Sequence, residues 1–209
     1  MTHSKSGRRR LRVGHGLLPP NPKQWDNEHN GLDLREDLTL TLDVELPHMQ
    51  AFALVPHVTV LPHGAIPVAA KFAEYLRIEG RSNWSGFSLR IDDENELVLF
   101  NDAHPVTRVR ATLMEEFFHL RLGHQRSVVR VLSTGAARSY DALIEHAAFG
   151  SGAAALLPYS ALKRLLDEGQ SIRTIANRFS VSDELVQYRL KVTRLYRRNR
   201  HAVRSRAGS

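Results

Sequence analysis

The segment that decides the fold runs from Arg110 to His124 and reads Arg-Ala-Thr-Leu-Met-Glu-Glu-Phe-Phe-His-Leu-Arg-Leu-Gly-His. Apolar side chains recur at the helical spacings of four, four and three residues, namely at Val109, Leu113, Phe117 and Leu120. At about 100° per residue, Glu116 falls within this apolar stripe and His119 on its edge. A buried carboxylate is costly unless it is paired or bound to a metal, so Glu116 is the first candidate functional residue. Gly123 predicts the helix end, with His124 just beyond it.

The spacing of Glu115, Glu116 and His119 is close to that of the zinc-peptidase motif His-Glu-x-x-His. In that motif two imidazoles four residues apart share one helix face and bind one metal ion, while the Glu is the general base for the attacking water. Glu116 and His119 occupy the positions of the base and the second ligand, and Glu115 replaces the first histidine. Glu115 and His119 can still bind one ion together, because residues at i and i+4 project from the same face.

A catalytic zinc ion takes about three protein ligands, so this helix needs a third from elsewhere. The candidates are Glu145 and His146, with His124 as a weaker alternative. Sites rich in carboxylates select zinc less strongly than histidine sites do, so Mn²⁺ and Fe²⁺ become competing occupants. The sequence therefore predicts a divalent metal site, with Zn²⁺ as the first candidate.

The same side chains also have purely structural interpretations. Glu115 would then be an exposed helix acid paired with Arg108 or Arg121, and His119 a hydrogen-bonded histidine at the edge of the core. Glu116 would form a buried salt bridge with an arginine of a neighbouring element. The residues alone leave both interpretations open.

Composition restricts the class of protein. The 209 residues are 42% apolar, which suits one domain with an ordinary core. No cysteine is present, which excludes disulfides, thiolate zinc sites and a cysteine nucleophile. The net charge of +7 is concentrated at the ends, so residues 1–30 are expected to form a poorly ordered basic leader and residues 197–209 a basic tail. Without a secretory or membrane-spanning apolar run, we expect a cytoplasmic protein with no membrane partner.

The rest of the chain alternates between strand and helix signals. Residues 32–46 alternate in polarity and are left open between a strand and irregular packing. Scattered histidines, His29, His48, His57 and His63, are read as surface residues. The expected elements are a strand over 58–61, a helix over 68–78, a hairpin of 84–91 with 96–100, a helix over 141–157, and three C-terminal helices over 162–166, 171–179 and 182–196.

Two of these helical regions carry further detail. The 141–157 helix is dense in Gly and Ala, which permits close backbone approach and predicts a central position, and Pro158 ends it. Ser171 and Ser182 are plausible N-caps. Residues 171–196 also resemble a helix-turn-helix, although glycine, common in the turn of that motif, is absent. The overall prediction is an α+β fold with a C-terminal helical lobe.

These segments follow one another in the order seen in the ImmA/IrrE family of metallopeptidases, which the chain resembles from about Val58 to Tyr196. The pieces that carry the resemblance are Trp84-Ser-Gly-Phe-Ser, Leu97-Val-Leu-Phe-Asn101 with His104, Glu116-x-x-His119 ending in Leu-Gly-His124, Gly152-Ala-Ala-Ala-Leu-Leu-Pro158, and Ile175-Ala-x-x-Phe-x-Val-Ser-x-x-Leu-Val-x-Tyr-Arg-Leu190. The resemblance implies a zincin-like domain over residues 31–196, with a short sheet packed on the motif helix. It also implies ligands from that helix and from a Glu on the next. The strand near Leu97–Asn101 would line a cleft in which an extended peptide adds by main-chain pairing.

Members of this family are bacterial or phage regulators that typically cleave a DNA-binding repressor. The chain departs from the family pattern at two ligand positions, Glu115 and Ala147, where the family has His and Glu. Three hypotheses follow. The first is a metallo-endopeptidase with Glu116 as base and His119, Glu115 and Glu145 as ligands, acting on a regulatory protein such as a repressor. The second is an inactive peptidase-fold protein that binds a partner, and the third is a DNA-binding regulator that uses the C-terminal helices.

Overall fold

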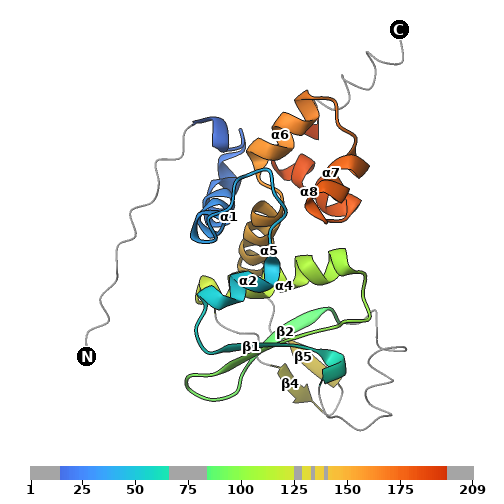
Figure 1. The fold of residues 1–209 in the computed structure, drawn as a ribbon. Helices are drawn as coiled ribbons and strands as arrows, with labels where there is room; N and C mark the ends of the chain where they lie inside the picture. Colours follow the sequence, from blue (N-terminus) through green and yellow to red (C-terminus); the bar gives the residue numbers. More distant parts are fainter. Residues whose placement is uncertain (1–14, 66–83, 125–128, 133–134, 139–140, 197–209) are drawn as a thin grey trace, which may run out of the picture.

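A computed structural model of the chain describes residues 15–65, 84–124, 129–132, 135–138 and 141–196. The fold is α+β, as predicted, and Figure 1 shows the helix α4 lying between a small sheet and the helices α1, α5 and α6 to α8. The helix expected over 68–78 lies outside the described residues, as do residues 1–14 of the basic leader and the whole basic tail, residues 197–209. The helices are α1 (Trp25–Asp37), α2 (His48–Ala51), α4 (Val106–Arg121), α5 (Ala142–Leu156), α6 (Tyr159–Asp167), α7 (Ile172–Phe179) and α8 (Asp183–Val192), and the strands are β1 (Val58–Pro62), β2 (Gly86–Arg90), β3 (Glu96–Phe100), β4 (Val129–Leu132) and β5 (Gly135–Arg138).

The main sheet has the strand order β1-β3-β2, with β3 parallel to β1 and antiparallel to β2. The predicted hairpin is confirmed: Phe87 pairs with Leu99, and the Asp92 carboxylate accepts hydrogen bonds from the backbone amides of Glu94 and Asn95 in its turn. Because β3 is paired on both sides, it cannot accept an added peptide strand. The expected main-chain pairing of a peptide with the strand near Leu97–Asn101 is therefore wrong. The strand β2 presents an outer edge that pairs with no other strand in the part of the chain described.

The helix α4 begins after Pro105 and packs on β2 and β3. Its apolar stripe is fully buried at Leu113 and Phe117, as the periodicity predicts. The helix ends as Gly123 indicates: Gly123 has a φ of 65°, and the amide of His124 donates to the carbonyl of His119. This pattern of a left-handed residue and a hydrogen bond back over the last turn is a Schellman motif.

The helix α5 is the central helix, as its small residues predict, and lies between α1 and α4. A Cβ added at Gly152 would lie 3.0 Å from the backbone carbon of Met114 and 3.2 Å from the backbone nitrogen of Glu115. A Cβ at Gly31 in α1 would lie 2.6 Å from the backbone nitrogen of Ala155. Side chains larger than hydrogen at these positions would force the helices apart, so the glycines set both spacings.

The helix α1 was missed by the sequence analysis. Residues 22–30 form a 3-10 helix and the first turns of α1, so a poorly ordered leader up to residue 30 is wrong. The residues 32–46 are part of α1 followed by irregular backbone. No apolar stripe marks this helix because buried polar groups hold it: the Asn30 amide donates to Ser151 on α5, and the Arg35 guanidinium donates to the carbonyl of Ala155.

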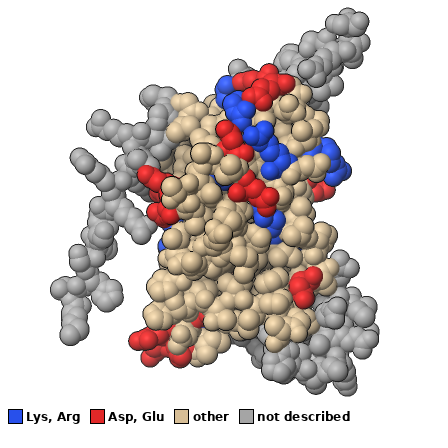
Figure 2. Space-filling model, viewed as in Figure 1, with Lys and Arg blue, Asp and Glu red and all other residues tan. Residues whose placement is uncertain are grey.

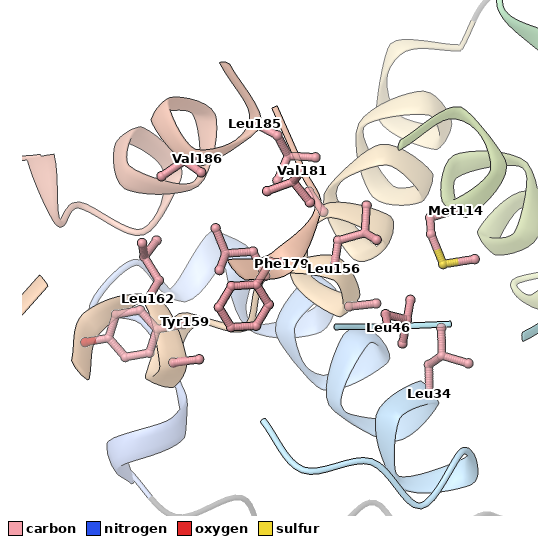
Figure 3. Packing of buried hydrophobic residues seen from close by; sticks show 14 of the residues in the cluster. Leu34, Leu46, Met114, Leu156, Tyr159, Leu162, Phe179, Val181, Leu185 and Val186 are labelled. Carbon is pink, nitrogen blue, oxygen red and sulfur yellow. The ribbon is translucent and has the colours of Figure 1, made fainter. Parts of the chain in front are cut away.

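The C-terminal lobe of α6, α7 and α8 completes one continuous core. Figure 3 shows Leu162, Phe179 and Leu156 together, where α6 and α7 meet the end of α5. Ser171 and Ser182 cap α7 and α8 as predicted, each accepting a hydrogen bond from a backbone amide three residues later. The last helix ends at Val192 rather than at residue 196, because Arg194 adopts a left-handed φ of 62°.

Candidate metal centre

Glu116 is buried on the face of α4 that packs on the sheet. It is 5% exposed, and the hydroxyl of Ser88 on β2 donates to its Oε2 over 2.6 Å. The close approach of β2 to α4 allows this contact, since a Cβ added at Gly86 would lie 2.6 Å from Cγ2 of Thr112. Ser88 was missed by the sequence analysis. Its position in the sequence could have indicated it, because Ser88 is a hydroxyl residue between the apolar residues Phe87 and Leu89, in a strand expected to pack on the motif helix.

His119, one turn closer to the end of α4, is 8% exposed and has neighbours at both ring nitrogens. Its Nδ1 lies 3.3 Å from Nδ1 of His124, and the two rings meet edge to face at 5.2 Å. The Schellman motif causes this contact because it turns the chain back over the last helical turn. Burial lowers the pKa of His124, which the charges of Glu145 and Asp141 partly offset. His124 therefore contacts His119 directly and buttresses its ring.

The other ring nitrogen of His119 faces α5, where Glu145 lies in the first turn. Nε2 of His119 is 3.4 Å from Oε2 of Glu145. Glu145 and Gly152 are seven residues, or about two turns, apart and so share a helix face. Gly152 abuts the backbone of Glu115, so this face of α5 packs against α4. Ala147, two residues after Glu145, lies about 200° further around the helix. It therefore faces away from α4, whereas Glu145 faces His119.

Glu115, His119 and Glu145 each offer a ligand atom, and these atoms all lie within 4.8 Å of one another. This set is the one group of three such side chains, among the residues described, that is close enough to hold a metal ion. The 3.4 Å between His119 and Glu145 also matches the separation of about 3.4 Å expected for two ligands of a tetrahedral ion with bonds of about 2.1 Å. One imidazole and two carboxylates therefore suit a divalent cation in both chemistry and spacing.

The other residues considered for this site have different neighbours. His146 is exposed, and its Nε2 lies 3.5 Å from the side-chain amide of Gln24, away from the cluster. The guanidinium of Arg121 is bonded to Asp37, and that of Arg108 to the hydroxyl of Ser85, so neither has the role suggested for it beside Glu115. His63 was read as a surface residue but is only 2% exposed.

Trp84, Asn101 and His104, which contributed to the family resemblance, position the helix rather than the cluster. The carbonyl of Trp84 lies 2.9 Å from Nε2 of His104, and the side-chain amide of Asn101 donates to the same carbonyl. Asn101 also accepts a hydrogen bond from the backbone amide of Ala103. These bonds connect the start of β2 with the turn between β3 and α4, and so fix where the motif helix begins.

Comparison with known families identifies a peptidase domain in the chain. Residues 71–191 match the family model Peptidase_M78, described as the IrrE N-terminal-like domain, which is more than half of the 209 residues. The match includes the motif helix α4, the helix α5 that carries Glu145, and most of the C-terminal lobe. Searches of curated proteins and of solved structures each found no match. No helix within the described ranges is long and apolar enough to cross a membrane. The chain therefore belongs to the IrrE N-terminal-like peptidase family.

Proposed function

We propose that this protein is a metal-dependent endopeptidase that acts on a regulatory protein, such as a transcriptional repressor. The observation that carries the proposal is the convergence of Glu115, His119 and Glu145 beside the buried Glu116, in a chain that belongs to a peptidase family. Membership in the family supports a protein substrate. The choice of a repressor rests on the resemblance to the ImmA/IrrE peptidases.

Glu115, His119 and Glu145 would hold the ion. A divalent cation bound there supplies Lewis-acid polarisation of the peptide carbonyl and acidifies the attacking water. Two carboxylates in the donor set favour hard cations more than a set of histidines does, so Mn²⁺ and Fe²⁺ compete with Zn²⁺. His124 orients His119 by contacting Nδ1, which leaves Nε2 directed to Glu145.

Glu116 is the general base. It accepts a proton from the attacking water and delivers it to the nitrogen of the leaving amine. Ser88 holds the carboxylate through Oε2, which fixes the orientation of the group. The outer edge of β2, which carries Ser88, is the place for an extended substrate to pair with the main chain, since β3 is already paired on both sides.

The first test is metal content, measured by elemental mass spectrometry on the full chain after dialysis against Zn²⁺, Mn²⁺ or Fe²⁺. We expect near one equivalent in the wild type and in Glu116→Gln, and a loss of the metal in His119→Ala. Cleavage is then measured by mass spectrometry on a library of proteome-derived peptides. Glu116→Gln should lower the cleavage rate by about 100-fold to 10,000-fold while it keeps the metal.

Absence of bound metal with every ion would overturn the enzyme proposal. The second candidate, an inactive peptidase-fold protein that binds a partner, would then apply. Replacement of the family histidine by Glu115 favours this candidate. Partner binding would be indifferent to chelators and to Glu116→Gln.

A further inference from the structure

A groove of about 1000 Å³ runs along α8. It is lined by Glu184, Gln187, Tyr188, Lys191, Arg194 and Tyr196. Its volume is at the upper end of the range of ligand sites in proteins, and is large enough for several residues of a peptide. None of these residues takes part in the chemistry proposed above.

The groove is connected to the candidate metal centre through the helix α5. The ring of Tyr188 packs edge to face on Phe149, with the centroids 5.0 Å apart. Phe149 lies one helical turn after Glu145 on α5, so both side chains project from the same region of that helix. Burial raises the pKa of Tyr188, the charge of Arg189 lowers it, and the charge of Glu115 raises it further. The tyrosine is therefore within electrostatic reach of a candidate ligand.

The hydroxyl of Tyr188 is buried and has no hydrogen-bond partner among the described residues. A buried hydroxyl that makes no hydrogen bond costs about 1–3 kcal/mol, so such groups are uncommon in native structures. A ligand that accepts a hydrogen bond in the groove would remove this cost. The hydroxyl is thus a donor positioned for an acceptor that the described residues do not supply.

The basic and acidic side chains of the groove lie at opposite ends of α8. Lys191 and Arg194 are exposed at the end of α8, and within the described ranges neither forms an ion pair. Glu184 occupies the opposite end, in the first turn of the helix. Three other basic residues of the lobe form ion pairs: Lys163 pairs with Asp167, Arg164 with Asp43 and Glu168, and Arg173 with Asp183. The groove therefore attracts an anionic group at its Lys191 end.

We propose that this groove binds the substrate segment beside the cleaved bond, and that it selects an acidic residue next to an aromatic one. The acidic side chain accepts from the Tyr188 hydroxyl and pairs with Lys191 and Arg194, and the aromatic side chain packs on the rings of Tyr188 and Tyr196. This inference rests on the proposed peptidase function, because it assigns part of the substrate preference of that site.

The same helix corresponds to the recognition helix of the helix-turn-helix hypothesis, but its features favour a peptide. A recognition helix contacts base edges with the residues near its N-terminus, and α8 has Asp183 and Glu184 there, which repel phosphates. Its flank is hollowed rather than protruding. On the face shown in Figure 2, Lys and Arg over the helical lobe are interspersed with Asp and Glu, so they form no continuous basic surface there.

The test measures peptide binding apart from catalysis. Fluorescein-labelled peptides with blocked ends, identical except for a central Phe-Asp-Glu, Phe-Asn-Gln, Phe-Lys-Lys or Ala-Asp-Glu, are titrated with the full-length Glu116→Gln protein, and anisotropy is recorded. The Phe-Asp-Glu peptide should bind about tenfold more tightly than Phe-Asn-Gln, the effect of one hydrogen bond to a charged group. A Phe-Asn-Gln peptide with an unblocked C-terminus tests whether a terminal carboxylate can replace the acidic side chain in binding.

Three variants in the Glu116→Gln background sharpen the result. Lys191→Glu should weaken Phe-Asp-Glu binding and shift the preference to Phe-Lys-Lys. Lys163→Glu makes the same change of charge on α6, outside the groove, and should leave the preference unchanged. Tyr188→Phe removes only the hydroxyl and keeps the packing on Phe149, so it should reduce selection of the acidic peptide without unfolding the protein.

Equal binding of all four peptides, or tighter binding of duplex DNA that Lys191→Glu abolishes, would overturn the inference. The proposed function fails separately. If acidic peptides bind as expected but the metal-loaded wild type cleaves none of them, the groove is a binding surface of an inactive protein. If the wild type cleaves peptides with no acidic preference, the endopeptidase stands and the groove assignment is wrong.

Discussion

Two acidic clusters among the described residues differ in how far their carboxylates are exposed and in which groups they meet. Glu28 is fully buried between α1 and the C-terminal lobe: its Oε2 accepts from the Arg189 guanidinium and its Oε1 from the backbone amide of Tyr159, each over 2.5 Å. At the candidate metal centre, Glu115 and Glu145 converge with His119 and remain partly exposed. Burial and pairing of a carboxylate therefore do not by themselves indicate a functional site. A candidate site is distinguished by several ligand atoms that meet at one accessible point.

The largest effect on stability is expected at the buried pair of Glu28 and Arg189. Arg189→Met should lower the free energy of unfolding by about 3–5 kcal/mol, because Glu28 would remain buried without its cation. Urea unfolding followed by circular dichroism measures the change. The double variant Glu28→Gln with Arg189→Met should recover part of the loss, and metal bound per folded molecule should stay constant. A single variant as stable as the wild type would show that the pair is not what holds α1 to the lobe.

Substitution at the candidate metal centre should lower metal affinity and leave the stability of the fold nearly unchanged. Glu145→Gln should weaken Mn²⁺ or Zn²⁺ binding at least about a hundredfold, or about 2.7 kcal/mol, with little change in metal-free stability. Isothermal titration calorimetry measures the affinity. His146→Ala is the matched control, because His146 is the neighbouring residue on α5 and faces away from the cluster. If His146→Ala weakens binding and Glu145→Gln does not, the assignment of the third ligand is wrong.

A smaller effect is expected from the hydroxyl that orients Glu116. Ser88→Ala should lower kcat/KM for the peptide substrate about tenfold, since one hydrogen bond to a carboxylate contributes about 1.5–3 kcal/mol. The metal content should not change, because Ser88 contacts the base and none of the three candidate ligands. Ser85→Ala, on the same segment but bonded to Arg108, is the control. Equal activity of both variants would remove Ser88 from the site.

The last prediction concerns a third polar cluster, in which the Arg110 guanidinium donates to Nδ1 of His48. Burial, then the charge of Arg110, lowers the pKa of His48 from 6.5 to about 4, and Glu45 partly offsets this. The folded protein thus favours the neutral imidazole of His48. Its contribution to the free energy of unfolding is complete above pH 6.5 and is lost as the pH falls toward 4, because the unfolded state then takes up a proton more readily than the folded state. Thermal unfolding of the wild type and of His48→Gln between pH 4 and 6.5 measures this contribution. The variant should show a flatter profile, with or without chelator, and identical profiles would contradict the role of His48.

Much of the fold could be predicted because periodicity depends only on neighbours in the chain. The Val109–Leu120 stripe indicated the motif helix and the burial of Glu116, the Asp/Asn turn indicated the hairpin, and Ser171 and Ser182 indicated the caps. The helix α1 gave no such signal, because polar groups such as Asn30 and Arg35 bury against α5 instead of an apolar stripe. Nor could the strand order be read, since β3 takes its central place by pairing with β1, which precedes it by more than thirty residues.

For the site, the sequence by itself determined that Glu115 and His119 share one face of a helix and that Glu116 lies within its buried stripe. Only the tertiary structure decided that Glu145, rather than His146 or the family position Ala147, reaches Nε2 of His119, and that His124 contacts Nδ1 of the same ring. It also packed Tyr188 of the α8 groove on Phe149, one helical turn after Glu145 on α5. The physical reason is that a helix fixes directions only within itself. Which residues of α4 and α5 face each other depends on their packing register, which the close contact at Gly152 sets.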